Sequence, residues 1–117
     1  MRQSVPTEID FADAEILGHS RNGEEFLVRV KAWNEERVLV QFVGTLGLRD
    51  RGAWSVSDLC QSPIETPLLL ESLRYHFEVI PEDHGFHVFE FLDGDDAPVL
   101  EVIAKEVRIR RESVSAG

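Results

Sequence analysis

The stretch Phe26-Leu27-Val28-Arg29-Val30, followed by Val38-Leu39-Val40-Gln41-Phe42, carries apolar residues at every second position. Successive side chains of a β-strand point to opposite faces, so a period of two indicates strands with one buried face. The same alternation returns in Phe77-Glu78-Val79 and in Phe89-Glu90-Phe91. Because antiparallel sheets commonly bury one face only, the pattern predicts an all-β, mainly antiparallel fold.

Length and composition indicate one compact domain. The 117 residues are enough for a single core, and we expect one β domain over residues 1–117 whose residues 1–10 form a loosely ordered N-terminal arm. Hydrophobic residues make up 43% of the chain, which argues against disorder. No apolar run approaches a membrane span, and the N-terminus lacks the apolar stretch of a signal peptide. We therefore expect a cytoplasmic protein with no membrane partner.

The charge of the chain points to a basic partner. The formal net charge is −10, with 22 acidic and 12 basic residues, so phosphates would be repelled and nucleic acid is not expected as a partner. Eight acidic residues and no Lys or Arg lie between Tyr75 and Ala104. This acidic strip either keeps the sheet soluble or binds a basic protein. Its candidate partner-binding residues are Glu82, Asp83, Glu90, Asp93, Asp95 and Asp96.

Turn residues place the first hairpins. Asn22-Gly23 predicts a two-residue type I′ turn after a strand over residues 14–19, because that turn needs positive φ at both central positions. The resulting register pairs Leu17 with Val28 and His19 with Phe26.

A three-residue loop at residues 34–36 is expected to join the two strands quoted above. It aligns Val30 with Val40 and Val28 with Phe42, which keeps the apolar residues of both strands on one face.

The middle of the chain predicts one turn, one short strand and one helix. Asp50-Arg51-Gly52 is typical of a turn and leads into a strand over residues 54–56. Thr66 is a helix N-cap residue, Pro67 suits the first helical position, and residues 68–73 favour helix. We expect a helix of about two turns that covers one end of the sheet.

Three further strands are predicted in the C-terminal third. A loop at residues 81–85 pairs Val79 with His87, Phe77 with Phe89 and Tyr75 with Phe91. A loop at residues 93–98 pairs Phe91 with Leu100, Phe89 with Val102 and His87 with Ala104. After Ala104 the apolar phase shifts by one, which predicts a β-bulge at Lys105-Glu106. The whole pattern predicts a sandwich or partly open barrel of seven or eight strands with one short helix.

The histidines and the cysteine do not predict a metal site. The register places His76 and His87 on opposite faces and His84 in a loop, so the three cannot bind one ion. Instead His76 is expected to pair with Glu90 across the outer face, and His87 to lie at the rim of the inner face. Cys60 is the only cysteine, which excludes an internal disulfide and is best explained as a small buried apolar residue.

No catalytic motif is present, and no cofactor is expected. Ser55 and Ser57 lie near Asp58, but no glycine-flanked elbow surrounds either serine and no histidine is near them in the chain. We therefore expect a protein that is not an enzyme, with no catalytic, cofactor-binding or metal-binding residues.

Three segments together resemble a known class of proteins. They are Phe11-x-Asp13-Ala14-x-Ile16, the run Val38-Leu39-Val40-Gln41-Phe42-Val43-Gly44, and the ending Leu100-x-Val102-x-Ala104-x-x-Val107-x-Ile109. These patterns span most of the chain and resemble small β-rich bacterial domains of unknown function, some of which are immunity proteins of polymorphic toxin systems. The resemblance implies a non-catalytic binding protein and assigns no site residue. An acidic face would steer such an inhibitor onto a basic toxin.

An alternative function belongs to a different class. A barrel could bind a small molecule if Trp33, Trp54, Tyr75 and Phe91 lined a cavity instead of filling a core. A toxin gene beside the gene for this chain would favour the immunity function over the barrel.

Overall fold

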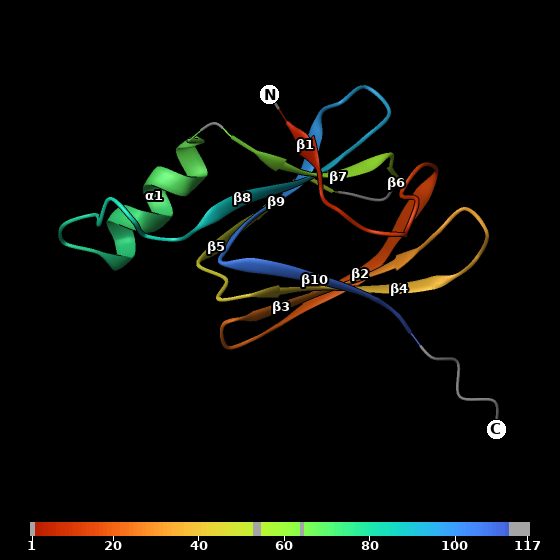
Figure 1. Cartoon of the computed structure of the whole chain (residues 1–117), viewed down its shortest axis with the longest axis horizontal. Helices are drawn as coiled ribbons and strands as arrows, with labels where there is room; N and C mark the ends of the chain where they lie inside the picture. Colours follow the sequence, from red (N-terminus) through yellow and green to blue (C-terminus); the bar gives the residue numbers. More distant parts are fainter. Residues whose placement is uncertain (1, 53–54, 64, 113–117) are drawn as a thin grey trace.

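Figure 1 shows the chain as a computed structural model, which describes residues 2–52, 55–63 and 65–112. Within these ranges no helix has the length and apolar character needed to span a bilayer. The described residues form ten strands and one helix: β1 (Gln3–Ser4), β2 (Ala14–Asn22), β3 (Glu25–Lys31), β4 (Arg37–Val43), β5 (Gly47–Asp50), β6 (Ser55–Val56), β7 (Asp58–Ser62), α1 (Pro67–His76), β8 (His87–Leu92), β9 (Pro98–Ala104) and β10 (Glu106–Arg111).

The strands form two five-stranded sheets. Sheet A has the order β1-β7-β8-β9-β5, and sheet B has the order β10-β4-β3-β2-β6. The strand pairs in both sheets are antiparallel, which confirms the predicted all-β antiparallel sandwich. The described part of the chain has more strands than the predicted seven or eight, partly because β1 and β6 are two-residue strands at sheet edges.

The core lies between the two sheets and is built around aromatic rings. Phe26 and Phe42 come from sheet B, Phe89 and Phe91 come from sheet A, and all four are buried. The ring of Phe42 lies 5.5 Å from that of Phe89 and 6.1 Å from those of Phe26 and Phe91. These side chains occupy the alternating positions that the sequence pattern assigns to the buried face.

The β2–β3 hairpin has its turn one residue later than predicted. Asn22 pairs with Glu25, which leaves Gly23 and Glu24 as the loop, and within this loop only Gly23 has positive φ, at 62°. The predicted pairs of Leu17 with Val28 and His19 with Phe26 are therefore wrong. A bulge between Ile16 and Gly18 changes the phase of β2, so Leu17 turns outward while Ile16 still pairs with Val30.

The β3–β4 loop has the predicted three residues but lies at residues 33–35. The Ala32 N–H donates to the Glu36 carbonyl at 2.9 Å, and Val30 pairs with Val38 instead of Val40. Likewise Val28 pairs with Val40 instead of Phe42. A two-residue shift leaves each side chain on its own face, so alternation could not distinguish the two registers.

The helix begins where the sequence predicts. The Leu69 N–H donates to the Thr66 hydroxyl at 3.3 Å, and Pro67 is the first helical residue. The helix extends to His76, and its leucines Leu68, Leu69 and Leu73 pack against Val88 and Ile103 on the outer face of sheet A.

The predicted strand near residues 75–79 is therefore wrong. Residues 75–76 end the helix, and residues 77–86 connect it to β8. On the edge of β8 away from β9 the neighbouring strand is β7, so there Phe89 pairs with Gln61 and Phe91 pairs with Leu59. The pairs predicted for Tyr75, Phe77 and Val79 do not form.

The C-terminal hairpin is confirmed. Phe91 pairs with Leu100, Phe89 with Val102 and His87 with Ala104.

The phase change after Ala104 has a cause other than the predicted bulge. The chain leaves sheet A at the end of β9 and joins sheet B as β10, and at this corner the Lys105 N–H donates to the Val43 carbonyl at 3.0 Å. Val107 and Ile109 then pack against the core from the other sheet.

Candidate partner-binding site

The structure divides the candidate acidic residues into two exposed groups at opposite ends of β8. Glu82 and Asp83 lie in the segment between α1 and β8, and we call residues 75–86 the tip. Asp93, Asp95 and Asp96 lie in the loop between β8 and β9, and we call residues 93–97 the acidic hairpin. Between the two groups lies β8, whose six residues span about 20 Å. Figure 1 shows α1 and the following loop projecting from one end of the molecule.

Glu90 does not lie on the exposed surface. Its side chain is 3% exposed, and its Oε1 atom accepts a hydrogen bond from Arg2 Nε at 3.0 Å. The predicted pair of Glu90 with His76 is wrong, because His76 ends α1 and does not lie in a strand beside β8. The alternation pattern correctly places Glu90 on the face of sheet A opposite the main core, but Arg2 covers this part of the face.

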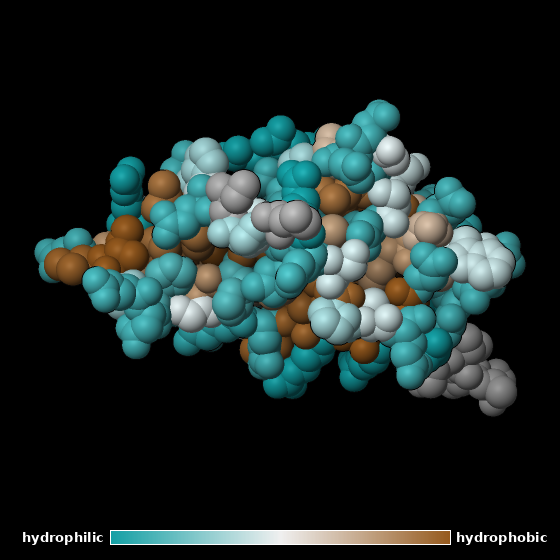
Figure 2. Space-filling model, turned by 45° about the horizontal axis from the view of Figure 1, so that its top comes forward, coloured by the Kyte–Doolittle hydropathy of each residue, from teal (hydrophilic) through white to brown (hydrophobic). Residues whose placement is uncertain are grey.

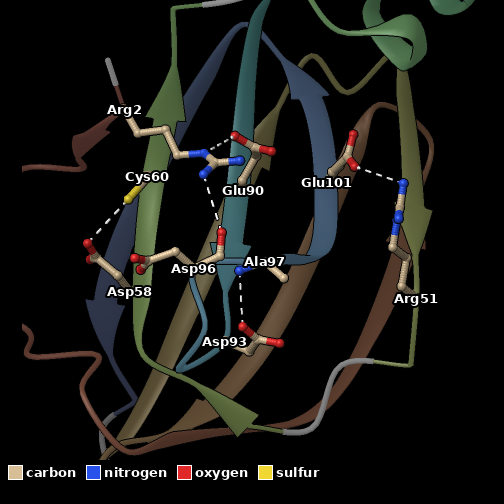
Figure 3. A network of polar contacts seen from close by, with 9 residues as sticks. All are labelled: Arg2, Arg51, Asp58, Cys60, Glu90, Asp93, Asp96, Ala97 and Glu101. Atoms are coloured by element: carbon tan, nitrogen blue, oxygen red, sulfur yellow. Dashed lines mark hydrogen bonds and ion pairs between the residues drawn. The ribbon is translucent and has the colours of Figure 1, made fainter.

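Glu90 faces a second buried carboxylate. Glu101 lies directly across from it in the β8–β9 ladder and is also buried, with Arg51 Nη2 at 3.6 Å from its Oε1 atom (Figure 3). Like charges directly opposite in a ladder destabilise a sheet unless they are compensated. One arginine beside each glutamate supplies that compensation.

Arg2 connects three parts of the chain. Besides its hydrogen bond to Glu90, Arg2 donates from Nη1 to the Asp96 carbonyl at 3.3 Å. Close by, the Val5 N–H donates to the Leu59 carbonyl at 2.9 Å. The hydrogen bond to Glu90 raises the pKa of the Arg2 guanidinium above its ordinary value. Residues 2–5 therefore lie against sheet A beside the acidic hairpin (Figure 3).

The acidic hairpin is shaped by one of its own carboxylates. Asp93 Oδ1 accepts the backbone N–H groups of Asp95 at 2.8 Å and Ala97 at 3.0 Å, while Asp96 has a positive φ of 58°. The Asp93 side chain therefore stabilises the turn through these hydrogen bonds. Asp95 and Asp96 are exposed and can present their carboxylates to a partner.

The tip combines carboxylates with apolar side chains. Glu78, Glu82 and Asp83 are exposed, and so are Tyr75 at 87% and Val79 at 83%. Figure 2 shows hydrophobic surface at the end of the molecule where α1 and the following loop lie in Figure 1.

The histidines lie apart. His19 Nε2 is 2.9 Å from Asp50 Oδ2, His87 Nδ1 is 3.1 Å from Gln61 Nε2, and His84 Nδ1 accepts the Phe86 N–H. His87 is exposed at the start of β8, on the same face as Phe89. Among the described residues, no three His, Cys, Asp or Glu side chains are grouped to hold a metal ion.

Ser57, the serine next to Asp58, donates hydrogen bonds to backbone carbonyl groups. Ser57 Oγ donates to the Asp93 carbonyl at 2.6 Å, and His19 contacts Asp50 instead of this serine. Asp58 itself accepts from Ser4 Oγ at 2.6 Å. These contacts hold β1, β7 and the acidic hairpin together.

Cys60 is buried beside this network, and its chemistry is testable. Burial and the hydrogen bond from its Sγ to Asp58, at 3.2 Å, raise the pKa of the Cys60 thiol to about 11. Two pKa units reduce the reactive thiolate about 100-fold. We expect iodoacetamide at pH 8 to alkylate the folded chain about 100-fold more slowly than the urea-unfolded chain, measured by intact mass. Equal rates would contradict the burial.

The raised pKa also fixes a pH dependence. Because the folded chain holds the Cys60 proton more tightly, its contribution to stability is complete below about pH 9 and is lost as pH rises through about 11. A Cys60→Ala variant should lack this part of the alkaline loss of stability.

Sequence reasoning missed the tip's apolar residues and both arginine partners. Tyr75 and Val79 fit a strand pattern, and Arg2 lies 88 positions from Glu90 in the sequence. The packing of α1 on sheet A places the tip, the pairing of the N-terminal arm with β7 places Arg2, and the pairing of β5 with β9 places Arg51.

The comparisons with known proteins give no relative. No family model, curated protein or solved structure matches the chain.

Proposed function

We propose that the chain is a non-catalytic protein-binding module that captures a basic protein, as a toxin-immunity protein would. The observation that carries this proposal is a set of exposed carboxylates with no salt bridge to another described residue. These residues are Glu82, Asp83, Asp95 and Asp96.

Exposed carboxylates attract cations over several ångströms. In a chain with a net charge of −10 they raise the encounter rate with a basic surface and repel nucleic acid. The inner faces of the two sheets bury their apolar residues against each other, so these carboxylates lie outside the core and are free to act on an approaching partner.

The small-molecule alternative receives less support. Phe91 is in the core, Trp33 is 63% exposed on the β3–β4 loop, and Tyr75 is on α1. These three side chains do not line a common cavity, and Trp54 lies outside the described residues.

A charge-reversal experiment tests the proposal. The partner to be tested is the protein encoded by the gene next to the gene for this chain; the proposal expects it to be a basic toxin domain, and it is purified in an inactivated form. Association is measured by stopped flow at low and physiological salt. The test variant carries the four changes Glu82→Lys, Asp83→Lys, Asp95→Lys and Asp96→Lys. We expect its association to be slower than that of the native chain by about tenfold or more at low salt, because steering acts through exposed charges.

A matched variant separates local charge from net charge. It reverses four other exposed glutamates, so both variants have the same formal charge. The exposed charges themselves contribute little to the Tm of either variant, and only Asp96→Lys should lower it slightly, because Asp tolerates the positive φ of this position better than Lys does. Equal association rates in the two variants, or a neighbouring gene product that does not bind, would contradict the proposal. The control changes are Glu24→Lys, Glu25→Lys, Glu35→Lys and Glu65→Lys.

A further inference from the structure

We propose that the tip is the anchor of the interface: Tyr75 and Val79 enter an apolar pocket that is rimmed by Lys or Arg on the basic partner. This inference rests on the proposed function and assigns different roles to the two acidic groups.

Exposure singles out the tip. The described chain exposes four large hydrophobic residues, Leu17, Trp33, Tyr75 and Val79, and the last two are the most exposed. They lie only four positions apart, at the end of α1 and just beyond it. Tyrosine is enriched among the residues that dominate binding energy, because its large ring is buried at little entropic cost.

The tip is held in place by its own packing. The Phe77 N–H caps α1 by donating to the Leu73 carbonyl at 2.8 Å, and the rings of Phe77 and Phe86 lie 6.3 Å apart. Lys105 Nζ lies 5.5 Å from the centre of the Phe86 ring. Ile80 also packs on the apolar cluster beneath the helix. A surface that is already ordered loses less entropy on binding, so it suits an anchor.

Charge identifies the chemistry of the partner. The same tip segment carries the exposed carboxylates Glu78, Glu82 and Asp83, which form no salt bridge with another described residue. Burying such a surface is favourable only if cations meet the carboxylates. The complementary surface is an apolar pocket with a basic rim.

The acidic hairpin lacks an anchor. Its residues 93–97 are Asp-Gly-Asp-Asp-Ala, with no large apolar side chain. It can accelerate encounter, but it offers little area to slow dissociation. The two groups should therefore affect different rate constants.

The experiment measures both rate constants for the inactivated toxin domain by surface plasmon resonance. A Tyr75→Ala/Val79→Ser variant should dissociate at least about tenfold faster while its association rate changes less than about twofold. Asp95→Lys/Asp96→Lys should show the reverse, with slower association and unchanged dissociation. Trp33→Ala, which removes an exposed aromatic ring elsewhere, should change neither rate.

A photocrosslink tests the pocket directly. Benzoylphenylalanine in place of Tyr75 should form an adduct with an apolar partner residue next to Lys or Arg, located by mass spectrometry.

The kinetic experiment separates the two proposals. Unchanged dissociation of the Tyr75→Ala/Val79→Ser variant overturns the anchor, while slower association of the charge-reversed chain would still support the proposed function. If neither variant differs from the native chain, both proposals fail.

Discussion

Replacing Phe42 with alanine is expected to lower the free energy of unfolding by about 3–5 kcal/mol. Its ring is fully buried and contacts rings from both sheets, including Phe89 at 5.5 Å. The substitution leaves a cavity at the junction of the sheets that the surrounding strands can fill only in part. Because a domain of this size has about 5–15 kcal/mol of stability, this loss is a large fraction of the total and raises the unfolded population at 37 °C.

Urea denaturation followed by circular dichroism measures this loss. Phe42→Leu keeps most of the volume and should cost less than about 1.5 kcal/mol. Tyr75→Ala removes an aromatic ring that is 87% exposed and should cost no more than about 0.5 kcal/mol. If Phe42→Ala costs as little as Tyr75→Ala, the two sheets do not meet at Phe42.

The inner faces of the sheets could be predicted from sequence because the relevant signal is local. Phe26, Val28 and Val30 alternate with polar or half-buried residues, and their burial follows from the geometry of a strand. The β8–β9 register was also predictable, since a short loop joins two strands whose apolar positions match in only one phase. In the β3–β4 hairpin, the predicted and the observed register differ by two residues and place the same side chains on the buried face. The sequence pattern therefore could not distinguish them.

The end of the helix depends on distant residues. Tyr75, Phe77 and Val79 alternate like a strand, and nothing nearby in the sequence contradicts that interpretation. The position beside β8 is occupied by β7, whose Gln61 pairs with Phe89, so residues 75–79 have no strand to join. Packing of the leucines of α1 on sheet A then extends the helix to His76.

The candidate site was only partly predictable for the same reason. Composition identified Glu82, Asp83, Asp95 and Asp96 as acidic loop residues, and the structure exposes all four. Glu90 has the same charge and lies in the same stretch of sequence, yet it is buried. Its burial depends on Arg2, which no local pattern connects to β8.

Removing Arg2 is expected to show how strongly the buried carboxylates depend on compensation. In an Arg2→Ala variant, Glu90 would lie buried opposite Glu101 without its own cation. We expect a loss of about 1–3 kcal/mol, less than for a fully buried pair because the Arg2 side chain is 40% exposed. Arg110→Ala is the matched control, because Arg110 is exposed and forms no salt bridge within the described chain.

A second substitution, Glu90→Gln, shows whether charge or packing causes the loss of stability in the Arg2→Ala variant. Glu90→Gln keeps the shape of the side chain and removes its charge, so the Arg2→Ala/Glu90→Gln variant should be more stable than Arg2→Ala alone. Urea denaturation at neutral pH gives the comparison. If the double variant is no more stable than Arg2→Ala, the arginine contributes mainly by packing the N-terminal arm. Faster hydrogen exchange at the Val5 amide, which donates to Leu59, would then accompany the loss, because the arm would leave the edge of β7.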